Sequence, residues 1–286
     1  MPELPEVEAL VRFLRERAVG HAVASARLAS ISALKTFDPP LHAIEGATII
    51  EANRHGKFVD LSTGEAHLVF HLARAGWLRW YDEVPKTPVK PAKSPLALRV
   101  RLDDGSGFDL TEAGTKKSLA VYVVRDPAEI PGIARLGPDP TAPGFGESDF
   151  AAVLAGRRTR IKGVLRDQSV FAGIGNAYSD EILHAARMSP YALAANLSGD
   201  DVARLYRAMR DTLAEAVDEA SGRPPAELKD AKRRGMLVHG RTGQPCPVCG
   251  DGVRQVEFTD STFQYCPTCQ TGGKVLADRV LSRLVK

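Results

Sequence analysis

The 286-residue chain is long for one compact core, and a length of roughly 150 residues per domain favours two domains. With 44% hydrophobic and 26% charged residues, the composition excludes a disordered chain. No run approaches the roughly 20 apolar residues of a membrane span, and the acidic start MPELPEVEAL is unlike a secretory signal, so we expect a cytoplasmic protein without a membrane segment. The formal net charge of +3 weakly favours a polyanionic partner.

The first predicted element is an amphipathic helix over residues 5–20, where apolar residues recur at steps of three and four and a glycine follows. From residue 21 to about 130 the pattern changes to short apolar runs such as KFVDLS and HLVFHL, separated by turn residues. This pattern predicts a β-sandwich or barrel. Within it, residues 82–95 are rich in proline and lysine, which predicts an exposed loop.

A segment dense in glycine and proline, residues 132–148, separates this β-rich half from a helical half. We expect it to be a hinge. Further on, Ser198 to Asp201 resembles a capping box. Apolar residues from Val202 to Val217 then follow at helical spacing, which predicts one buried face of a long helix.

Two clusters of basic residues lie in the helical half, within residues 157–166 and 229–241. Such clusters can neutralise phosphates of a nucleic acid, although each could also be a solvated helix face. Between them, Gly173 and Gly175 precede a helical pattern, where bare N–H groups could hold a phosphate and Asn176 could add a donor. The alternative is a tight turn that needs glycine only for its dihedral angles.

The four cysteines form the pattern C-x2-C-x16-C-x2-C, which is typical of a zinc site. Its members are Cys246, Cys249, Cys266 and Cys269. Four thiolates leave no open position on a tetrahedral ion, so one structural Zn²⁺ is expected. The alternatives are two disulfides, which a cytosolic location disfavours, or a redox pair, which would not require a matched second pair. Zinc ribbons bind DNA, RNA or protein, so the ribbon alone does not define a function.

The first residues can carry covalent chemistry. Proline at position 2 allows removal of Met1, which leaves a secondary amine with a pKa of about 7.7–8.0. Attack of this amine on a sugar C1′ would displace the base and form an iminium ion, from which the 3′ phosphate could be eliminated. Glu3 could act as general acid and base, and Glu6 could orient the N-terminus. The alternative is that Pro2, Glu3 and Pro5 only begin a helix.

Taken together, these motifs resemble the formamidopyrimidine-DNA glycosylases (Fpg, also called MutM), with the endonuclease VIII (Nei) enzymes as a sister group. The resemblance covers nearly the whole chain, in the order of the family. The matching segments are Met1–Glu8, the lysine loop His55–Lys57, Ile161-Lys162 with Asp167-Gln168, the helix-two-turn-helix segment 172–183, and the zinc-finger arms His239–Cys246 and Tyr265–Gln270.

The resemblance implies a catalytic set and a partner. Pro2 would be the nucleophile, Glu3 the acid and base, and Lys57 would contact the phosphates beside the lesion and assist β-elimination. The partner would be double-stranded DNA with damaged bases or abasic sites, and the damaged nucleotide would be flipped out of the duplex. The expected DNA-binding residues are His71, Arg74, Lys162, Asn176, Tyr178 and Arg241.

The chain departs from the family where other members fill the space of the flipped base. Arg74 stands where the family generally has methionine, and residues 111–119 replace a stretch that supplies two further wedges, although Lys116 or Lys117 could approach phosphate. Asp260 stands near the finger tip, where an arginine is usual and where Arg254 could substitute. The sequence therefore does not predict specificity for 8-oxoguanine. Residues 271–286 extend beyond the usual end and suggest a short basic amphipathic helix.

The predicted fold is α+β, with an N-terminal helix and β-sandwich, then a helix-two-turn-helix domain with a β-hairpin zinc finger. The predicted boundaries are 1–131, a linker over 132–148, 149–240, and 241–286. The predicted function is a monomeric base-excision-repair glycosylase with AP-lyase activity, acting on oxidised bases. A DNA-damage-binding paralogue without catalysis is the first alternative. An RNA-binding zinc-ribbon protein is the second, although it leaves the nucleophilic N-terminus unexplained.

Overall fold

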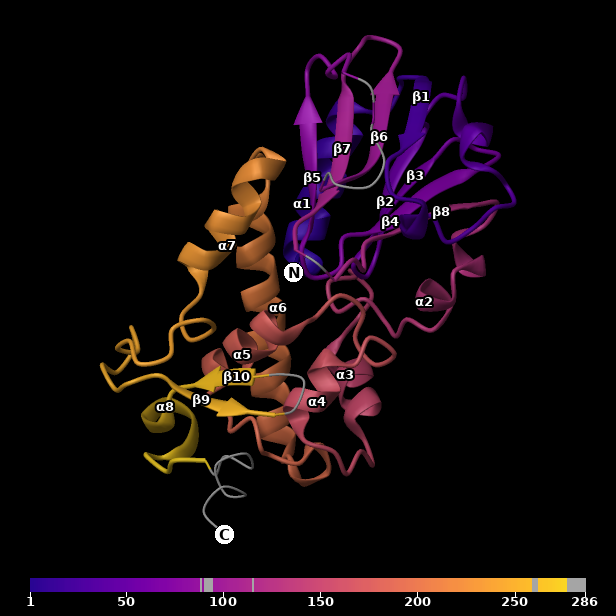
Figure 1. Cartoon of the computed structure of the whole chain (residues 1–286). Coiled ribbons are helices and arrows are strands. Elements are labelled where there is room, and N and C mark those ends of the chain that lie inside the picture. Colours follow the sequence, from indigo (N-terminus) through magenta and orange to yellow (C-terminus); the bar gives the residue numbers. More distant parts are fainter. Residues whose placement is uncertain (88, 90–94, 115, 259–261, 277–286) are drawn as a thin grey trace. The chain divides into compact units, whose positions relative to one another are not determined.

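The computed structural model describes residues 1–87, 89, 95–114, 116–258 and 262–276 (Figure 1). The chain divides into two compact units, Met1–Leu136 with Glu219–Asp230, and Gly137–Asp218 with Ala231–Lys286. The division after Leu136 lies inside the segment predicted as a linker, and the return of residues 219–230 to the first unit was not predicted. The predicted α+β fold is confirmed. Among the described residues, no helix combines the length and apolarity needed to cross a membrane.

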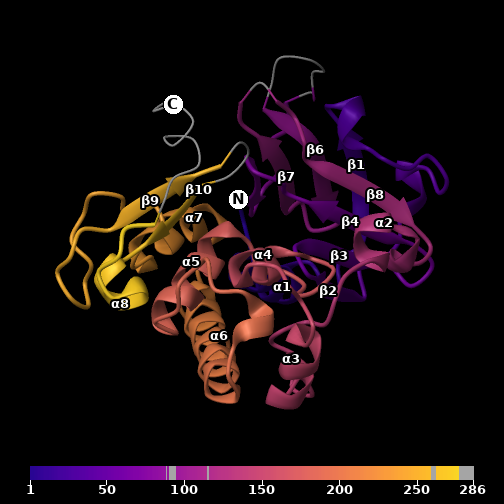
Figure 2. The same cartoon turned by 90° about the horizontal axis from the view of Figure 1, so that it is seen from below.

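The first unit is built on two four-stranded antiparallel sheets, labelled in Figures 1 and 2. One sheet has the order β1-β6-β7-β5, with β1 Val23–Leu28, β5 Gly76–Tyr81, β6 Leu96–Leu102 and β7 Gly107–Glu112. The other has the order β2-β3-β4-β8, with β2 Glu51–His55, β3 Phe58–Ser62, β4 His67–His71 and β8 Ala120–Val124. Along β6, Leu98, Val100 and Leu102 are fully buried and alternate with arginines, as expected for a strand with one apolar face.

Helix α1 (Leu4–Arg17) packs against β2 and β3. Its apolar stripe contributes Leu10 and Leu14, both fully buried, to the core between the sheets. The helix ends at Arg17, earlier than the predicted residue 20, because the Ala18 N–H closes the last turn on the Leu14 carbonyl. The short helix α2 (Pro131–Ala134) follows β8.

The second unit is helical and ends in a β-hairpin. Its elements are α3 Glu147–Leu154, α4 Ile161–Arg166, α5 Asn176–Ala185, β9 Arg254–Glu257, β10 Thr262–Tyr265 and α8 Pro267–Thr271. Two helices cross the division between the units, α6 Gly199–Ala220 and α7 Leu228–Gly235. Short 3₁₀ turns cover Ile31–Ala33, Leu41–Ile44, Pro127–Glu129, Ala194–Asn196 and Pro225–Glu227.

The predicted start and face of α6 are confirmed. The Ser198 hydroxyl accepts the Asp201 N–H at 3.2 Å, and the Asp201 carboxylate accepts the Ser198 N–H at 3.2 Å. Leu205, Met209 and Leu213 are fully buried along one face of the helix. Periodicity alone located this face because residues three and four apart lie on one side of a helix.

Several predicted features lie outside the described residues. Residues 88 and 90–94 of the proline-rich loop and Asp260 are among them, and so are residues 277–286, which hold most of the predicted C-terminal helix. The described part of the C-terminal extension ends at Leu276, whose N–H donates to the Tyr265 hydroxyl at 2.8 Å.

Candidate functional site

The N-terminal residues are built into the first turn of α1. Pro2 is buried, and Glu3 and Glu6 are 2% and 1% exposed. Glu3 is the N-cap, and its N–H donates to the Glu6 carboxylate at 2.8 Å, which forms one half of a reciprocal capping box. Pro5 occupies the second helical position, where its missing N–H removes no hydrogen bond. The helix start therefore holds both carboxylates in defined places next to Pro2.

Lys57 lies at the tip of the two-residue hairpin between β2 and β3. His55 and Phe58 form the closing pair, and Gly56 has a φ of +58°, as the first central residue of a type II′ turn requires. Lys57 itself is only 8% exposed. Helix α1, which carries the N-terminal carboxylates, packs against both strands of this hairpin.

His71 lies at the end of β4, directly opposite Phe58 in register, and the two rings are 4.8 Å apart. The Ala73 N–H donates to Nδ1 at 3.1 Å, so Nδ1 is the acceptor and the ring proton is on Nε2. Burial, and to a lesser degree the charge of Lys57, lowers the pKa of His71 from 6.5 to about 4. At neutral pH the ring is therefore an uncharged donor beside a cation.

This low pKa predicts an acid-sensitive fold. Between about pH 6.5 and pH 4 the unfolded chain binds a proton at His71 that the folded chain does not, so stability falls as the pH falls through this window. At one pKa unit per 1.36 kcal/mol, the loss between pH 7 and pH 4.5 is about 2–3 kcal/mol. Urea unfolding of wild type and His71→Gln at both pH values measures it. The variant should lose less than wild type by that amount, and the exposed control His42→Gln should lose as much as wild type.

Arg74 lies in a tight turn between β4 and β5. The Gly76 N–H donates to the Leu72 carbonyl at 2.8 Å, and a Cβ at Gly76 would come within 2.2 Å of that oxygen. Ala73 has a φ of +50°, an uncommon value for a residue other than glycine. The turn leaves the Arg74 side chain exposed.

Glu112 and Lys117 tie the described part of residues 111–119 to strand β7. The Glu112 carboxylate is 2% exposed and accepts the N–H groups of Ser118 and Leu119 at 2.9 and 3.0 Å. The Lys117 ammonium donates to the Glu112 carbonyl, while the neighbouring Lys116 side chain is exposed. Of the two lysines, Lys116 has the more accessible charge.

A carboxylate that was not predicted supports the Lys57 hairpin. Asp60 is 1% exposed and accepts from His55 Nε2 at 3.0 Å and from His67 Nδ1 at 2.8 Å. His55 directly precedes the Gly56-Lys57 turn, so the network anchors one end of the hairpin. His55, Asp60 and His67 lie on three different strands, β2, β3 and β4. The alternation of side chains along one strand is visible in a sequence, but the alignment of neighbouring strands is not.

In the second unit, Lys162 has a partner that the sequence did not reveal. Its ammonium is 2.6 Å from an Asp180 oxygen and 2.8 Å from the Ser179 hydroxyl, and Lys162 and Asp180 are 5% and 1% exposed. Asp180 also accepts from His239 Nδ1 at 2.7 Å. The charge expected to contact DNA is thus used inside the protein, where a buried carboxylate needs it.

The other predicted DNA contacts of this unit surround α5. The Asn176 amide donates to the Thr262 carbonyl of β10 at 2.7 Å, and its oxygen is buried without a hydrogen bond among the described residues. Tyr178 is 4% exposed, with the Lys232 ammonium 4.6 Å from its ring centre. Arg241 is half-buried, donates to the Met236 carbonyl at 3.4 Å, and has an Nε without a partner among the described residues.

A second missed carboxylate orders the segment before the finger. Glu181 is 5% exposed and accepts the N–H groups of Leu237, Val238 and His239 at 2.7–3.0 Å. Burial raises the pKa of Glu181, even though the three N–H hydrogen bonds lower it. Adjacent acidic residues inside a helical pattern were the available signal, but nothing local identifies partners more than 50 residues away.

The four cysteines converge as the spacing predicted. Their sulfur atoms all lie within 4.8 Å of one another, with Cys246–Cys269 at 3.9 Å and Cys249–Cys266 at 3.3 Å. Four sulfurs about 2.3 Å from one tetrahedral ion would be about 3.8 Å apart, whereas a disulfide requires about 2.05 Å. All four are free thiols, which argues against the disulfide alternative. The cluster can bind one metal ion.

The finger hairpin decides the place of Arg254. In the register of β9 and β10, Thr262 faces Glu257 next to the tip, while Tyr265 faces Arg254 at the opposite end. Three residues of strand separate Arg254 from the tip pair, about 10 Å. Arg254 is exposed and lies at the end of the hairpin away from the tip.

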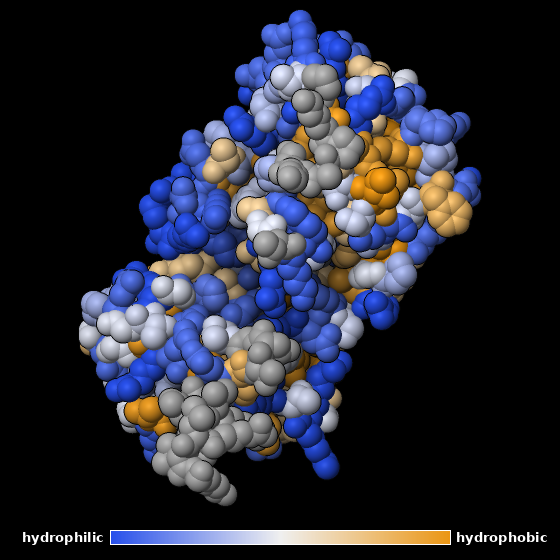
Figure 3. Space-filling model, viewed as in Figure 1, coloured by the Kyte–Doolittle hydropathy of each residue, from blue (hydrophilic) through white to orange (hydrophobic). Residues whose placement is uncertain are grey.

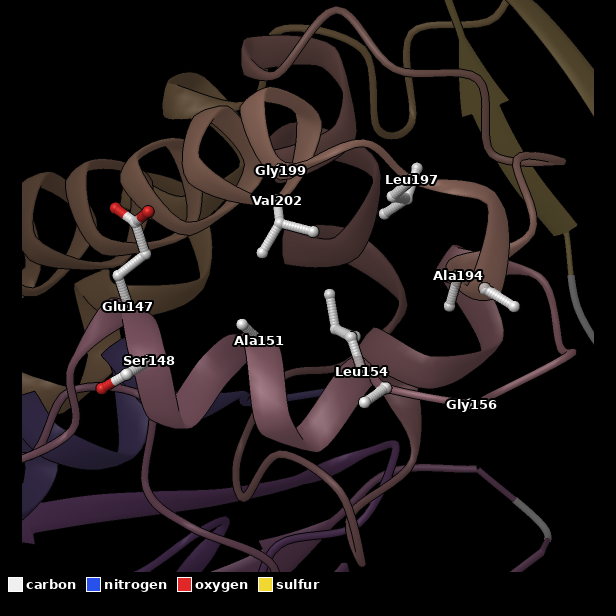
Figure 4. A pocket seen from close by; sticks show the side chains of 11 residues that line it. Glu147, Ser148, Ala151, Leu154, Gly156, Ala194, Leu197, Gly199 and Val202 are labelled. Carbon is white, nitrogen blue, oxygen red and sulfur yellow. The ribbon is translucent and has the colours of Figure 1, made fainter.

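Surface hollows do not offer a better site. One hollow lies between α3 and the start of α6, and Glu147 is the only titratable residue among the 11 that line it (Figure 4). Figure 3 shows a largely hydrophilic face with hydrophobic side chains gathered on the first unit, where Ile31 and Phe37 are 84% and 90% exposed. The described lining of the hollow, with one titratable residue, offers no group of side chains for acid–base chemistry.

Comparisons with known proteins identify the family of the chain. A family model described as the formamidopyrimidine-DNA glycosylase N-terminal domain matches residues 1–118, and one described as its H2TH domain matches residues 136–224. An uncharacterized formamidopyrimidine-DNA glycosylase-like protein of Mycobacterium tuberculosis is 58% identical over 151 residues, 53% of this chain and 94% of the relative. The formamidopyrimidine-DNA glycosylase of Symbiobacterium thermophilum is 35% identical over 280 residues, 94% of this chain and 89% of the relative.

A solved structure extends the similarity to the fold. Wild-type Lactococcus lactis Fpg (MutM), in complex with DNA containing N7-benzyl-Fapy-dG, superposes with a TM-score of 0.83 at 25% identity. The match covers 94% of this chain and 100% of that one. Because family models match domains in both units and relatives match over nearly the full length, the chain belongs to the formamidopyrimidine-DNA glycosylase family.

Proposed function

We propose that this chain is a base-excision-repair DNA glycosylase with AP-lyase activity that removes oxidised bases from double-stranded DNA. The observation that carries the proposal is the ordered N-terminus. Pro2 is buried and precedes Glu3, which forms a reciprocal capping box with Glu6. Family membership and the DNA complex of the Lactococcus lactis relative support the same reading. The N-terminal amine is the one group that accounts for both base loss and strand cleavage.

The reaction starts once Met1 has been removed. Glu3 gives a proton to the sugar ring oxygen, the bond from C1′ to this oxygen breaks, and the Pro2 nitrogen forms a bond to C1′. The proton of the Pro2 amine then passes to the base, and the bond from C1′ to the base breaks, which leaves an iminium ion between C1′ and the Pro2 nitrogen. Loss of a C2′ proton then sends its electron pair toward C3′, and the 3′ phosphate leaves. Hydrolysis of the iminium regenerates the amine.

Lys57 and His71 are the proposed phosphate contacts of the first unit. Lys57 supplies a positive charge, and the neutral His71 supplies an Nε2–H donor whose tautomer the Ala73 N–H selects. A cation and a neutral donor side by side can bind one phosphate without the repulsion of two cations. Asp60, through His55, would keep the hairpin that bears Lys57 in place.

In the second unit we propose that Asn176 and Arg241 contact the DNA backbone, with Arg74 of the first unit stacking through its guanidinium plane. We further propose that the four cysteines hold one structural Zn²⁺. The ion would stabilise the finger hairpin. It would take no part in the reaction, because four thiolates complete its tetrahedral coordination.

Borohydride trapping tests the proposal. Purified protein with mature Pro2 is incubated with an abasic-site duplex and borohydride, which reduces the iminium to a stable protein–DNA adduct. We expect the adduct with native protein, and none with protein that retains Met1, because the Pro2 nitrogen is then an amide without a nucleophilic lone pair. No adduct with the native protein would refute the lyase activity and favour the damage-binding alternative. A panel of duplexes, each with one oxidised base, then identifies the excised lesion.

A further inference from the structure

The side chain of His184 contacts the cysteine cluster from helix α5. Its Nε2 is 3.3 Å from the Cys246 sulfur, and His184 and Cys246 are 3% and 2% exposed. Both partners are closed off from water, and among the described residues the imidazole is the nitrogen donor within reach of this sulfur.

The proton of this ring can be placed. His184 Nδ1 is buried and has no hydrogen-bond partner among the described residues. A buried donor without an acceptor costs more than a buried acceptor without a donor when the ring can choose its tautomer. The proton therefore sits on Nε2, and the bond runs from the imidazole N–H to the sulfur.

Four thiolates around one divalent ion carry a net charge of −2, which must be stabilised by donors or water. Cys249 is exposed to solvent, whereas Cys246 and Cys266 are 2% and 0% exposed. For the buried Cys246 sulfur, the imidazole of His184 lies within hydrogen-bond distance. His184 does not belong to the group of ligand atoms within 4.8 Å of one another, which consists of the four sulfurs.

We propose that His184 is a determinant of metal affinity in this chain, donating an N–H···S hydrogen bond to the Cys246 thiolate without binding the ion. The inference rests on the proposed zinc site. Through this hydrogen bond, the end of α5 contacts a metal ligand, while the start of the same helix carries Asn176.

A second link lies close by. The Gln270 amide accepts the Cys266 N–H at 2.9 Å and donates to the Met188 carbonyl at 3.0 Å, four residues beyond His184. Both cysteine pairs are thus held by the end of α5 and the turn that follows. Occupancy of the metal site and the position of this helix are therefore coupled in the second unit.

The test measures zinc affinity of the full chain by competition with a chromophoric chelator. His184→Phe keeps an aromatic ring of similar size but removes the donor, and we expect a 10- to 100-fold weaker affinity, about the cost of losing such a partner in other metal sites. His184→Gln keeps an N–H and should lose less. His42→Phe, in an exposed 3₁₀ turn, is the matched control and should bind as wild type.

Two spectroscopic readouts on wild type remain informative if a variant fails to fold. With cobalt in place of zinc, the ligand-field bands should be those of a four-sulfur site, and bands of a three-sulfur, one-nitrogen site would overturn the role assigned to His184. With cadmium, a scalar coupling between the metal and the His184 Nε2 proton should cross the hydrogen bond, and its absence would contradict that bond. Wild-type affinity in His184→Phe would refute the inference alone, whereas a wild-type protein that binds no zinc would refute the zinc site itself.

Discussion

Replacing Lys162 with methionine is expected to lower the free energy of unfolding by about 3–5 kcal/mol, the usual cost of removing one partner from a buried ion pair. The reason is Asp180, which is 1% exposed and would be left, among the described residues, with His239 and the Gln264 N–H as its hydrogen-bond partners. Urea unfolding measures the loss. Asp180→Asn in the same chain should recover part of it, because the amide oxygen still accepts hydrogen bonds but carries no charge.

The control is Arg158→Met, an exposed member of the same basic cluster, which should change stability by no more than about 0.5 kcal/mol. The salt dependence of DNA binding distinguishes a Lys162 that pairs with Asp180 inside the protein from a Lys162 that contacts a phosphate. A phosphate contact would reduce the slope of log affinity against log salt by about 1 when it is removed. For folded Lys162→Met we expect an unchanged slope, and a reduced slope with unchanged stability would return Lys162 to the DNA surface.

Replacing Glu3 with glutamine is expected to slow base release about 100- to 10,000-fold, the range for removing a positioned proton donor. An amide cannot give a proton to the sugar ring oxygen. It has nearly the same size and still offers an oxygen to the first turn of α1, so the helix cap should survive. Single-turnover release of a damaged base from a duplex measures the effect, with circular dichroism to verify the fold.

Glu16→Gln is the matched control, since Glu16 is exposed on the same helix and should leave the rate unchanged. Equal rates for Glu3→Gln and wild type would remove Glu3 from the reaction. Loss of base release together with loss of the α1 helix signal would assign Glu3 to the capping box alone.

Local features were predictable because their partners are close in the chain. The stripe of α1, the capping box at Ser198 and the buried face of α6 all depend on steps of three or four residues, which helix geometry itself brings together. The short strands of the first unit followed from apolar runs, but their order in two sheets did not, because pairing joins residues far apart.

The candidate site was predictable in its residue types more than in its contacts. Lys57 and His71 were expected to contact DNA, and the structure adds that burial, and to a lesser degree the charge of Lys57, lowers the pKa of His71. The buried carboxylates Asp60, Asp180 and Glu181 escaped notice because an acidic residue in a sequence looks the same whether it meets water or a buried cation.

The sequence by itself determined the chemistry that the chain can carry: an N-terminal proline beside a glutamate, and four cysteines at metal-binding spacing. These are properties of neighbouring residues. Only the tertiary structure decided where the charges go, because Lys162 meets Asp180 across 18 residues and His184 meets Cys246 across 62. Burial selects among possible partners by the high cost of an unpaired charge or donor, and burial is a property of the packed chain.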